Sequence, residues 1–134
     1  MNGSTSLLTS LSVALGGGIG ALLRYQTGRL ITWWLGATVV SAFPFATLAV
    51  NAIGSIAMGL LAGYLARSGG SEPARLLLGV GLLGGFTTFS AFSLEMVVMI
   101  ERGQLLFALL YLILSVSLGI TGLIMGLNLM RMIG

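Results

Sequence analysis

The sequence predicts an all-α integral membrane protein: a single four-helix transmembrane domain spanning residues 1–134. Of the 134 residues, 57% are hydrophobic and 7% are charged, whereas soluble domains carry about 25% charged residues. The mean hydropathy is +1.09. Four long apolar runs are separated by short polar connections, and each run is long enough for a helix to cross the hydrocarbon core. This composition excludes a soluble enzyme.

The residue inventory excludes several kinds of chemistry. The chain contains no Cys and no His, so it offers neither thiolate nor imidazole for catalysis or for binding a transition metal. Its net charge of +3 comes from six basic and three acidic residues, without a basic patch that could hold nucleic-acid phosphates. We therefore expect no enzymatic activity, no organic cofactor and no nucleic-acid partner.

The first expected span is Leu7–Leu23, an uncharged run that ends before Arg24. It does not resemble a signal peptide, because no basic segment precedes it and no small-residue cleavage site follows. The connection Gly28–Phe43 contains Trp33 and Trp34, which favour the membrane–water interface. We expect this connection to form a short interfacial helix.

The other three expected spans are Phe45–Leu65, Leu76–Ile100 and Leu105–Met130. Pro44 stands at the start of the second span, where its missing N–H costs nothing. Turn residues at Ser68–Pro73 and at Glu101–Gln104 predict tight connections before and after the third span.

The arginines do not specify an orientation in the membrane. Four spans place the N-terminus, the second loop and the C-terminus on one side. Each side then receives three arginines: Arg67, Arg75 and Arg131 on the first, and Arg24, Arg29 and Arg102 on the second. Because the Lys/Arg imbalance sets topology, two interpretations stay open. Either another signal fixes one orientation, or copies insert both ways and pair as an antiparallel homodimer.

Glycine is abundant, with 21 residues, and small residues allow close packing of membrane helices. Ser55, Gly59 and Gly63 share one face of the second span. Packing is the expected role of this face. A chain this short has too little material to enclose a pore alone, which also favours an oligomer.

The third span contains the most informative segment, Gly84–Ser93, with the sequence GGFTTFSAFS. Paired glycines followed by two threonines are poor helix formers, so we expect the third helix to be broken near the bilayer midplane. Unwound backbone at that depth must be buried in protein or line a wet cavity, where its carbonyls and N–H groups can face ions. The alternative is a kinked helix whose Ser and Thr side chains bond back to their own carbonyls.

Phe89 and Phe92 are three residues apart and share a helical face. Such a pair usually packs in a core. Alternatively, the positive edge of each ring can meet a small anion weakly, which suits passage because conduction needs sites that an ion can leave.

Neutral polar residues inside the spans are Thr47 and Asn51 in the second, and Tyr111 and Ser115 in the fourth. The amide of Asn51 can donate to an anion or to another helix. Glu95 and Arg24 lie near the ends of their expected spans, where each either snorkels to the interface or lines a vestibule. Neutral donors suit weak, rapid handling of a small anion.

The segment Gly84–Glu95 resembles the central signature of the Fluc (CrcB) fluoride channels. Three further pieces agree with that family in order and spacing: Gly17–Arg24, Thr47–Asn51 and Glu101–Gly103. The resemblance covers all four spans, and the combination of pieces is specific although each glycine motif alone is not.

The resemblance implies an antiparallel, dual-topology homodimer with two pores in the inner (plasma) membrane, a multi-pass protein. Such a dimer passively exports fluoride from the cytoplasm and so reduces its toxicity. Backbone carbonyls of Gly84 and Thr87 from both subunits would hold a structural sodium ion at the dimer centre, in keeping with the oxygen ligands that hard cations prefer.

The resemblance also implies roles for individual side chains. Phe89 and Phe92 would be the aromatic pair along the fluoride path, with Asn51 as an amide donor. Thr47, Tyr111 and Ser115 would extend the polar track. The family often carries a second serine one turn after Ser115, where this chain has Gly119; water or Ser117 could substitute for it.

Two other functions compete with the channel. A small multidrug-type, proton-coupled exporter also has four spans, but it needs a membrane-embedded carboxylate, typically in the first helix. The first span has no acidic residue, and Glu95 lies too near the end of its span to serve well. A non-transporting subunit would be favoured if the segment Gly84–Ser93 were only a packing kink.

Overall fold

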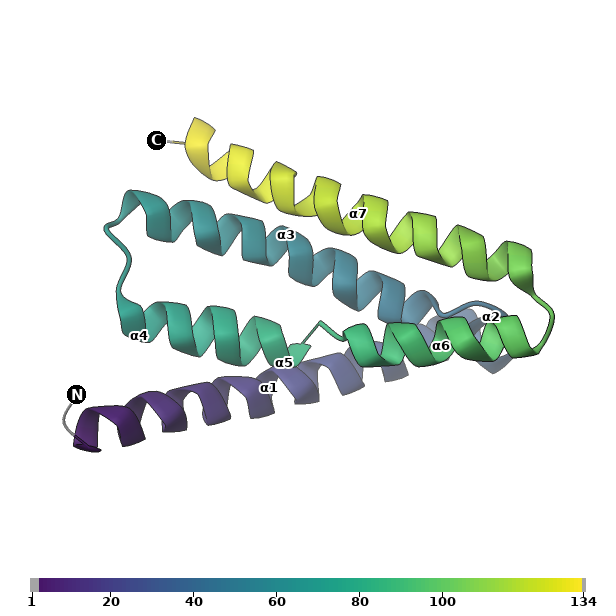
Figure 1. Ribbon diagram of the computed structural model, residues 1–134, viewed down its shortest axis with the longest axis horizontal. Coiled ribbons are helices and arrows are strands. Elements are labelled where there is room, and N and C mark those ends of the chain that lie inside the picture. The colour runs from purple at the N-terminus through teal and green to yellow at the C-terminus, as the bar shows by residue number, and fades with distance from the viewer. Residues whose placement is uncertain (1–2, 134) are drawn as a thin grey trace.

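The computed structural model describes residues 3–133, which are almost entirely helical. The elements are α1 (Gly3–Leu35), α2 (Ala37–Ala42), α3 (Phe45–Arg67), α4 (Glu72–Ala74), the π-helical segment η1 (Arg75–Leu83), α5 (Gly84–Phe86), α6 (Phe89–Glu101) and α7 (Leu105–Met132). The long helices run side by side along one axis, and both termini lie at the same end of the bundle (Figure 1). This arrangement is the one that an even number of spans produces.

Four stretches of the described chain are long and apolar enough to cross a membrane. They are Ser6–Leu35, Phe45–Arg67, Glu72–Glu101 and Leu105–Met132. The predicted all-helical fold with four spans is therefore confirmed, and the protein is a multi-pass membrane protein. The third stretch comprises four consecutive elements, from α4 to α6.

The first helix is longer than the sequence predicts. The expected boundary at Leu23 is wrong, because α1 continues through Arg24 to Leu35. Arginine is a good helix former and can extend its charged head along the helix, so one arginine does not end a helix. The helix stops where Gly36 adopts φ 85°, a conformation that only glycine takes readily. Only α2 remains of the expected interfacial segment.

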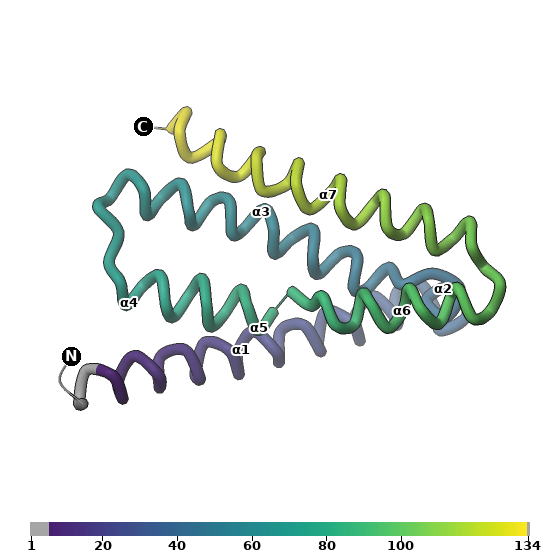
Figure 2. The backbone as a smooth tube through the Cα atoms, in the orientation of Figure 1, coloured from purple at the N-terminus to yellow at the C-terminus, as the bar shows by residue number. Residues whose placement is uncertain are grey.

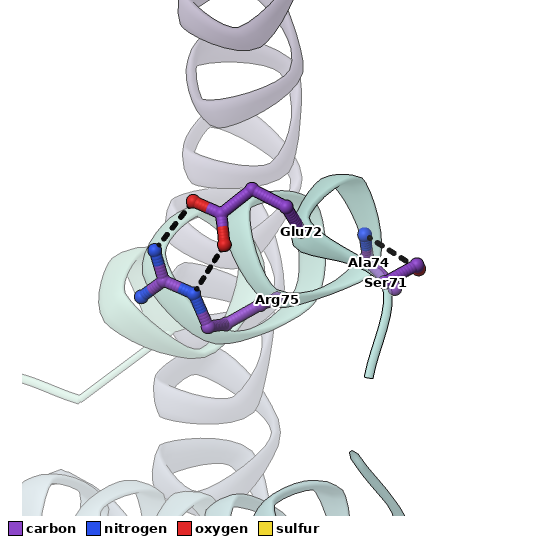
Figure 3. Close-up of polar contacts among 4 residues, drawn as sticks. All are labelled: Ser71, Glu72, Ala74 and Arg75. Carbon is purple, nitrogen blue, oxygen red and sulfur yellow. Dashed lines mark hydrogen bonds and ion pairs between the residues drawn. The ribbon is translucent and has the colours of Figure 1, made fainter. Parts of the chain in front are cut away.

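The connection from α3 to α4 is a tight turn with its own polar contacts. Gly69 has φ 71°. The Ser71 side chain then caps the next helix by accepting a hydrogen bond from the N–H of Ala74 at 3.4 Å. The carboxylate of Glu72 accepts two hydrogen bonds from the guanidinium of Arg75, the shorter of 2.7 Å (Figure 3). Both charges are exposed and remain at the end of the bundle.

Glycines bring helix backbones together at two contacts. On α1, a Cβ added to Gly20 would overlap the backbone carbonyl oxygen of Leu82. On α7, a Cβ added to Gly126 would overlap the carbonyl oxygen of Ile56 in α3. Small residues thus permit the close approach on which helix association in lipid depends, and they hold α1 against the third span and α3 against α7.

The helical backbone is interrupted between α5 and α6. Thr87 and Thr88 are extended, with φ/ψ of −111°/120° and −126°/111°. The tube of Figure 2 runs nearly straight at this point before it coils again into α6. The interruption falls within the segment that begins with the paired glycines Gly84 and Gly85.

Candidate functional site

Asn51 of α3 fixes the extended backbone at Thr88. The Oδ1 atom of Asn51 accepts a hydrogen bond from the backbone N–H of Thr88 at 2.7 Å, and its Nδ2 donates to the carbonyl of Thr88 at 3.2 Å. One amide side chain therefore satisfies both backbone groups of a buried residue that has left the helix. Among residues 3–133, no acceptor is found for the second N–H of the Asn51 amide.

The hydroxyls of the interrupted segment divide into two groups. Thr87 and Ser93 donate to the carbonyls of Leu83 and Phe89 in their own helices, at 3.0 and 2.9 Å. Thr88 instead caps α6, because its hydroxyl accepts from the N–H of Ala91 at 3.2 Å. Back-bonding, the alternative considered from the sequence, accounts for only part of this segment.

The interruption also changes the partners of two carbonyl groups. In a continuous helix the N–H of residue i+4 bonds to the carbonyl of residue i. The N–H of Thr88, which would serve Gly84, is donated to Asn51. The N–H of Ala91, which would serve Thr87, is donated to the Thr88 hydroxyl. The carbonyls of Gly84 and Thr87 therefore each lose the partner that an unbroken helix provides.

Glu95 of α6 joins α3 and α7 through its carboxylate. Thr47 donates to Oε1 at 2.6 Å, and the Tyr111 hydroxyl donates to Oε2 at 2.6 Å. The sequence predicts Glu95 only near the end of its span, at the interface or in a vestibule. The structure shows that it also connects two residues of the predicted polar track.

A row of aromatic rings in contact extends from Tyr111, the partner of Glu95, to Phe89. The ring centroids of Phe89 and Phe92 are 5.7 Å apart, and those of Phe92 and Tyr111 are 5.0 Å apart. The Tyr111 ring meets Phe43 edge to face, with a centroid distance of 5.5 Å. Phe89 stands at the open end of this line and is 79% exposed.

A pocket of about 350 Å³ lies beside the interruption. Its lining residues come from α3, the interrupted segment, α6 and α7: Asn51, Ser55, Thr87, Thr88, Phe89, Phe92, Ser115, Val116 and Gly119. None of these is charged. Four of the residues predicted for the path thus meet in one pocket, while Thr47 and Tyr111 lie beyond Phe92.

Ser115 is one of the residues that line this pocket. Its Oγ is buried and makes no hydrogen bond within the part of the chain that the structure describes, although Tyr111 is a polar neighbour. A buried hydroxyl without a partner is costly.

The two charged vestibule candidates line separate pockets. Arg24 lines a pocket of about 260 Å³ together with Thr47 and Thr88. Glu95 lines a pocket of about 250 Å³ that also includes Arg102. Each charge therefore borders a space next to the polar residues, and neither lines the pocket at the interruption.

Ser55 is a further candidate for the site, although its position among small residues predicts helix packing. It lines the pocket at the interruption. The available signal was its spacing: Ser55 follows Asn51 by four residues, which places both on one helical face.

The fold and the site together define a class: a multi-pass α-helical membrane protein whose helices enclose neutral hydrogen-bond donors and aromatic rings. Residues 11–127 match the family model described as CrcB-like protein, Camphor Resistance (CrcB). The chain belongs to this family, as the sequence motifs predict.

Relatives of high identity extend over nearly the whole chain. A protein of Erythrobacter litoralis (strain HTCC2594) is 61% identical over 94% of each chain. One of Novosphingobium aromaticivorans is 58% identical over 89% of this chain and 93% of its own. One of Rhodopseudomonas palustris (strain BisB5) is 48% identical over 94% and 99%. All three are named fluoride-specific ion channel FluC.

Proposed function

We propose that this protein is a fluoride-selective passive ion channel, and so not an enzyme. The observation that carries the proposal is the uncharged pocket in which Asn51, Ser115 and Phe89 meet. Relatives up to 61% identical are named as fluoride-specific channels, and this identity extends over the helices that form the pocket.

The chemistry of the pocket suits fluoride. Fluoride is a small anion that accepts several short hydrogen bonds, and the pocket provides an amide and hydroxyls as neutral donors. The positive edges of Phe89 and Phe92 add weak attraction. No fixed cation lines the pocket, so the ion is bound loosely enough to leave, as conduction requires.

Export follows from the membrane potential. Fluoride enters a cell as neutral hydrofluoric acid, which crosses a bilayer more readily than an ion, and it loses its proton in the cytoplasm. An inside-negative potential drives an anion outward with about 2.3 kcal/mol per 100 mV. A passive channel in the plasma membrane therefore lowers cytoplasmic fluoride without an energy source.

The proposal is tested by anion efflux from liposomes that contain the purified protein. We expect fluoride release far above that of protein-free liposomes, and no chloride release from the same preparation. Absence of fluoride release would overturn the proposal. Chloride release at a similar rate would show that the channel is not selective for fluoride.

We further propose that two copies pair in antiparallel orientation and form two pores. Phe89 borders the pocket yet is 79% exposed, which is unusual for a ring beside an ion path unless a second copy covers it. Counted by the loops expected from the sequence, the arginines also divide evenly between the two sides of the membrane, which permits insertion in both orientations. Reporters fused to the C-terminus should give signal from both compartments, and signal from one compartment alone would exclude dual topology.

The same dimer would hold one structural sodium ion between the carbonyls of Gly84 and Thr87. Both carbonyls lack the N–H partner of a continuous helix, and Gly84 is exposed where a second copy could approach. Oxygen ligands suit a hard cation. No cluster of three or more acidic, Cys or His residues exists among residues 3–133, so backbone oxygens are the fitting ligands.

Sodium removal tests this site. A ligand that binds only the folded protein stabilises it by about 2.7 kcal/mol at 100 times its Kd. We expect the thermal stability of the purified protein to rise with sodium concentration and saturate, at constant ionic strength. Equal stability in sodium and in N-methyl-D-glucamine would contradict the proposed site.

A further inference from the structure

Ser55 of α3 places another hydroxyl on the pocket at the interruption. It is half-buried and lines this pocket together with Asn51 and Ser115. Its hydroxyl donates to the carbonyl of Asn51 at 2.8 Å, the local i to i−4 bond that serine forms readily in helices. To donate to a solute in the pocket instead, the Ser55 side chain would have to rotate away from this carbonyl.

The facing part of α7 offers space but no hydroxyl. Gly119 lies one turn after Ser115 and lines the same pocket. A Cβ built on Gly119 would lie 3.6 Å from Ser55 Oγ, with no other described atom outside its own helix surroundings within 4 Å. The space in front of Gly119 is therefore next to the Ser55 hydroxyl.

A second pocket continues in the same direction. It has a volume of about 410 Å³ and includes Ser55, Ser115 and Gly119 in its lining. Ser117, the substitute considered from the sequence, is exposed and lines neither of the two pockets. Ser55 of α3 and Ser115 of α7 are thus the two hydroxyl side chains that line both spaces.

From this arrangement we infer that Ser55 donates a hydrogen bond to the fluoride ion as it passes between the two spaces, from the helix face opposite Ser115. The line of hydroxyls on α7 ends at Gly119, and α3 continues it. This inference rests on the proposed function, because it adds a donor to the same path.

Replacement of the hydroxyl tests the inference by fluoride efflux from liposomes. Loss of a hydrogen bond to a charged group costs about 1.5–3 kcal/mol, so Ser55→Ala should slow efflux by about tenfold or more. Ser55→Thr keeps a hydroxyl and should retain most of the rate. Ser117→Ala removes a hydroxyl outside the pocket and serves as the matched control, with an unchanged rate.

A relocated hydroxyl separates donation from packing. Because the Cβ position at Gly119 lies at ordinary contact distance from Ser55 Oγ, the double variant Ser55→Ala/Gly119→Ser moves the hydroxyl from α3 to α7. We expect it to recover most of the wild-type efflux rate, which repacking at residue 55 alone would not produce.

The inference is overturned if Ser55→Ala conducts at the wild-type rate. It is also overturned if Ser55→Ala is slow while both Ser55→Thr and the double variant remain equally slow. Wild-type protein in the same assay separates the inference about Ser55 from the proposed function. If the wild type conducts fluoride and the Ser55 variants contradict the inference, the proposed function still stands. If the wild type does not conduct fluoride, both the inference and the proposed function are wrong.

Discussion

At Thr88 the backbone exchanges its helical hydrogen bonds for two bonds to the side chain of Asn51, at 2.7 and 3.2 Å. The sequence indicated that Asn51 is a polar residue within a span and needs partners. It could not indicate that both partners belong to one residue 37 positions away. Residue type predicts the need for a hydrogen bond, and only the packing of α3 against the interrupted segment selects the partner.

Phe89 provides the sharpest test at this scale. Phe89→Ile keeps an apolar side chain but removes the ring edge from the pocket, so fluoride efflux should fall by at least about tenfold, while gel filtration shows unchanged assembly. A ring contact of this kind contributes about 0.5–1.5 kcal/mol, and the loss of shape at the path adds to it. Phe107→Ile is the matched control, because Phe107 lines none of the pockets described. Equal efflux from the two variants would contradict the role of the Phe89 ring.

Tyr111 tests the junction formed by Glu95. Tyr111→Phe keeps the ring contacts with Phe92 but removes the hydroxyl that donates to the Glu95 carboxylate at 2.6 Å. A hydrogen bond contributes about 0.5–1.5 kcal/mol, and we expect the free energy of unfolding in mixed micelles to fall by about that amount. Tyr64→Phe, at an exposed ring, should leave it unchanged. An equal loss of unfolding free energy in both variants would show that the hydrogen bond between Tyr111 and Glu95 does not contribute specifically to stability.

At the scale of elements, the sequence predicted three spans closely and one poorly. The starts of α3 and α7, at Phe45 and Leu105, agree with the predicted ones because proline and a glycine turn mark them. The first span was predicted too short because a single charge was taken as a boundary. In the structure α1 passes through Arg24 and stops at Gly36, so backbone geometry ends this helix and charge does not.

Close packing between elements gives a prediction with an internal control. A Cβ at Gly20 would overlap the backbone of Leu82 and lie 2.6 Å from the N atom of Phe86. Backbone atoms cannot avoid this overlap by a change of rotamer, as a flexible side chain could. Gly20→Ala should therefore force α1 away from the third span and lower the unfolding free energy by about 1–3 kcal/mol. At Gly18 nothing lies within 4 Å.

Gly18→Ala should therefore be neutral or stabilising by up to about 1 kcal/mol, because alanine favours a helix over glycine. Thermal unfolding of the two variants beside the wild type gives the comparison. Similar loss in both would show that helix propensity or detergent, and not the contact with Leu82, determines the effect.

For the whole molecule, the four-span topology was readable because apolar runs and turns occur in sequence order. The pocket was only partly readable. The family resemblance assigned Asn51, Phe89, Phe92 and Ser115 to the path, and the structure brings these four residues together in one pocket. Ser55 was missed, since its position among small residues equally suits packing. The bridge of Glu95 to Thr47 and Tyr111 depends on three helices meeting, which no single segment encodes.

The central claim is passive, fluoride-selective conduction, and the reversal potential of the purified protein in a lipid bilayer tests it most directly. With a tenfold fluoride gradient and equal chloride on both sides, a selective channel should reverse at the fluoride equilibrium potential, about 59 mV. This value should not change when a proton gradient is added. A reversal potential that follows the proton gradient would indicate a coupled exporter, and one near zero would indicate an unselective pore; either result would contradict the account.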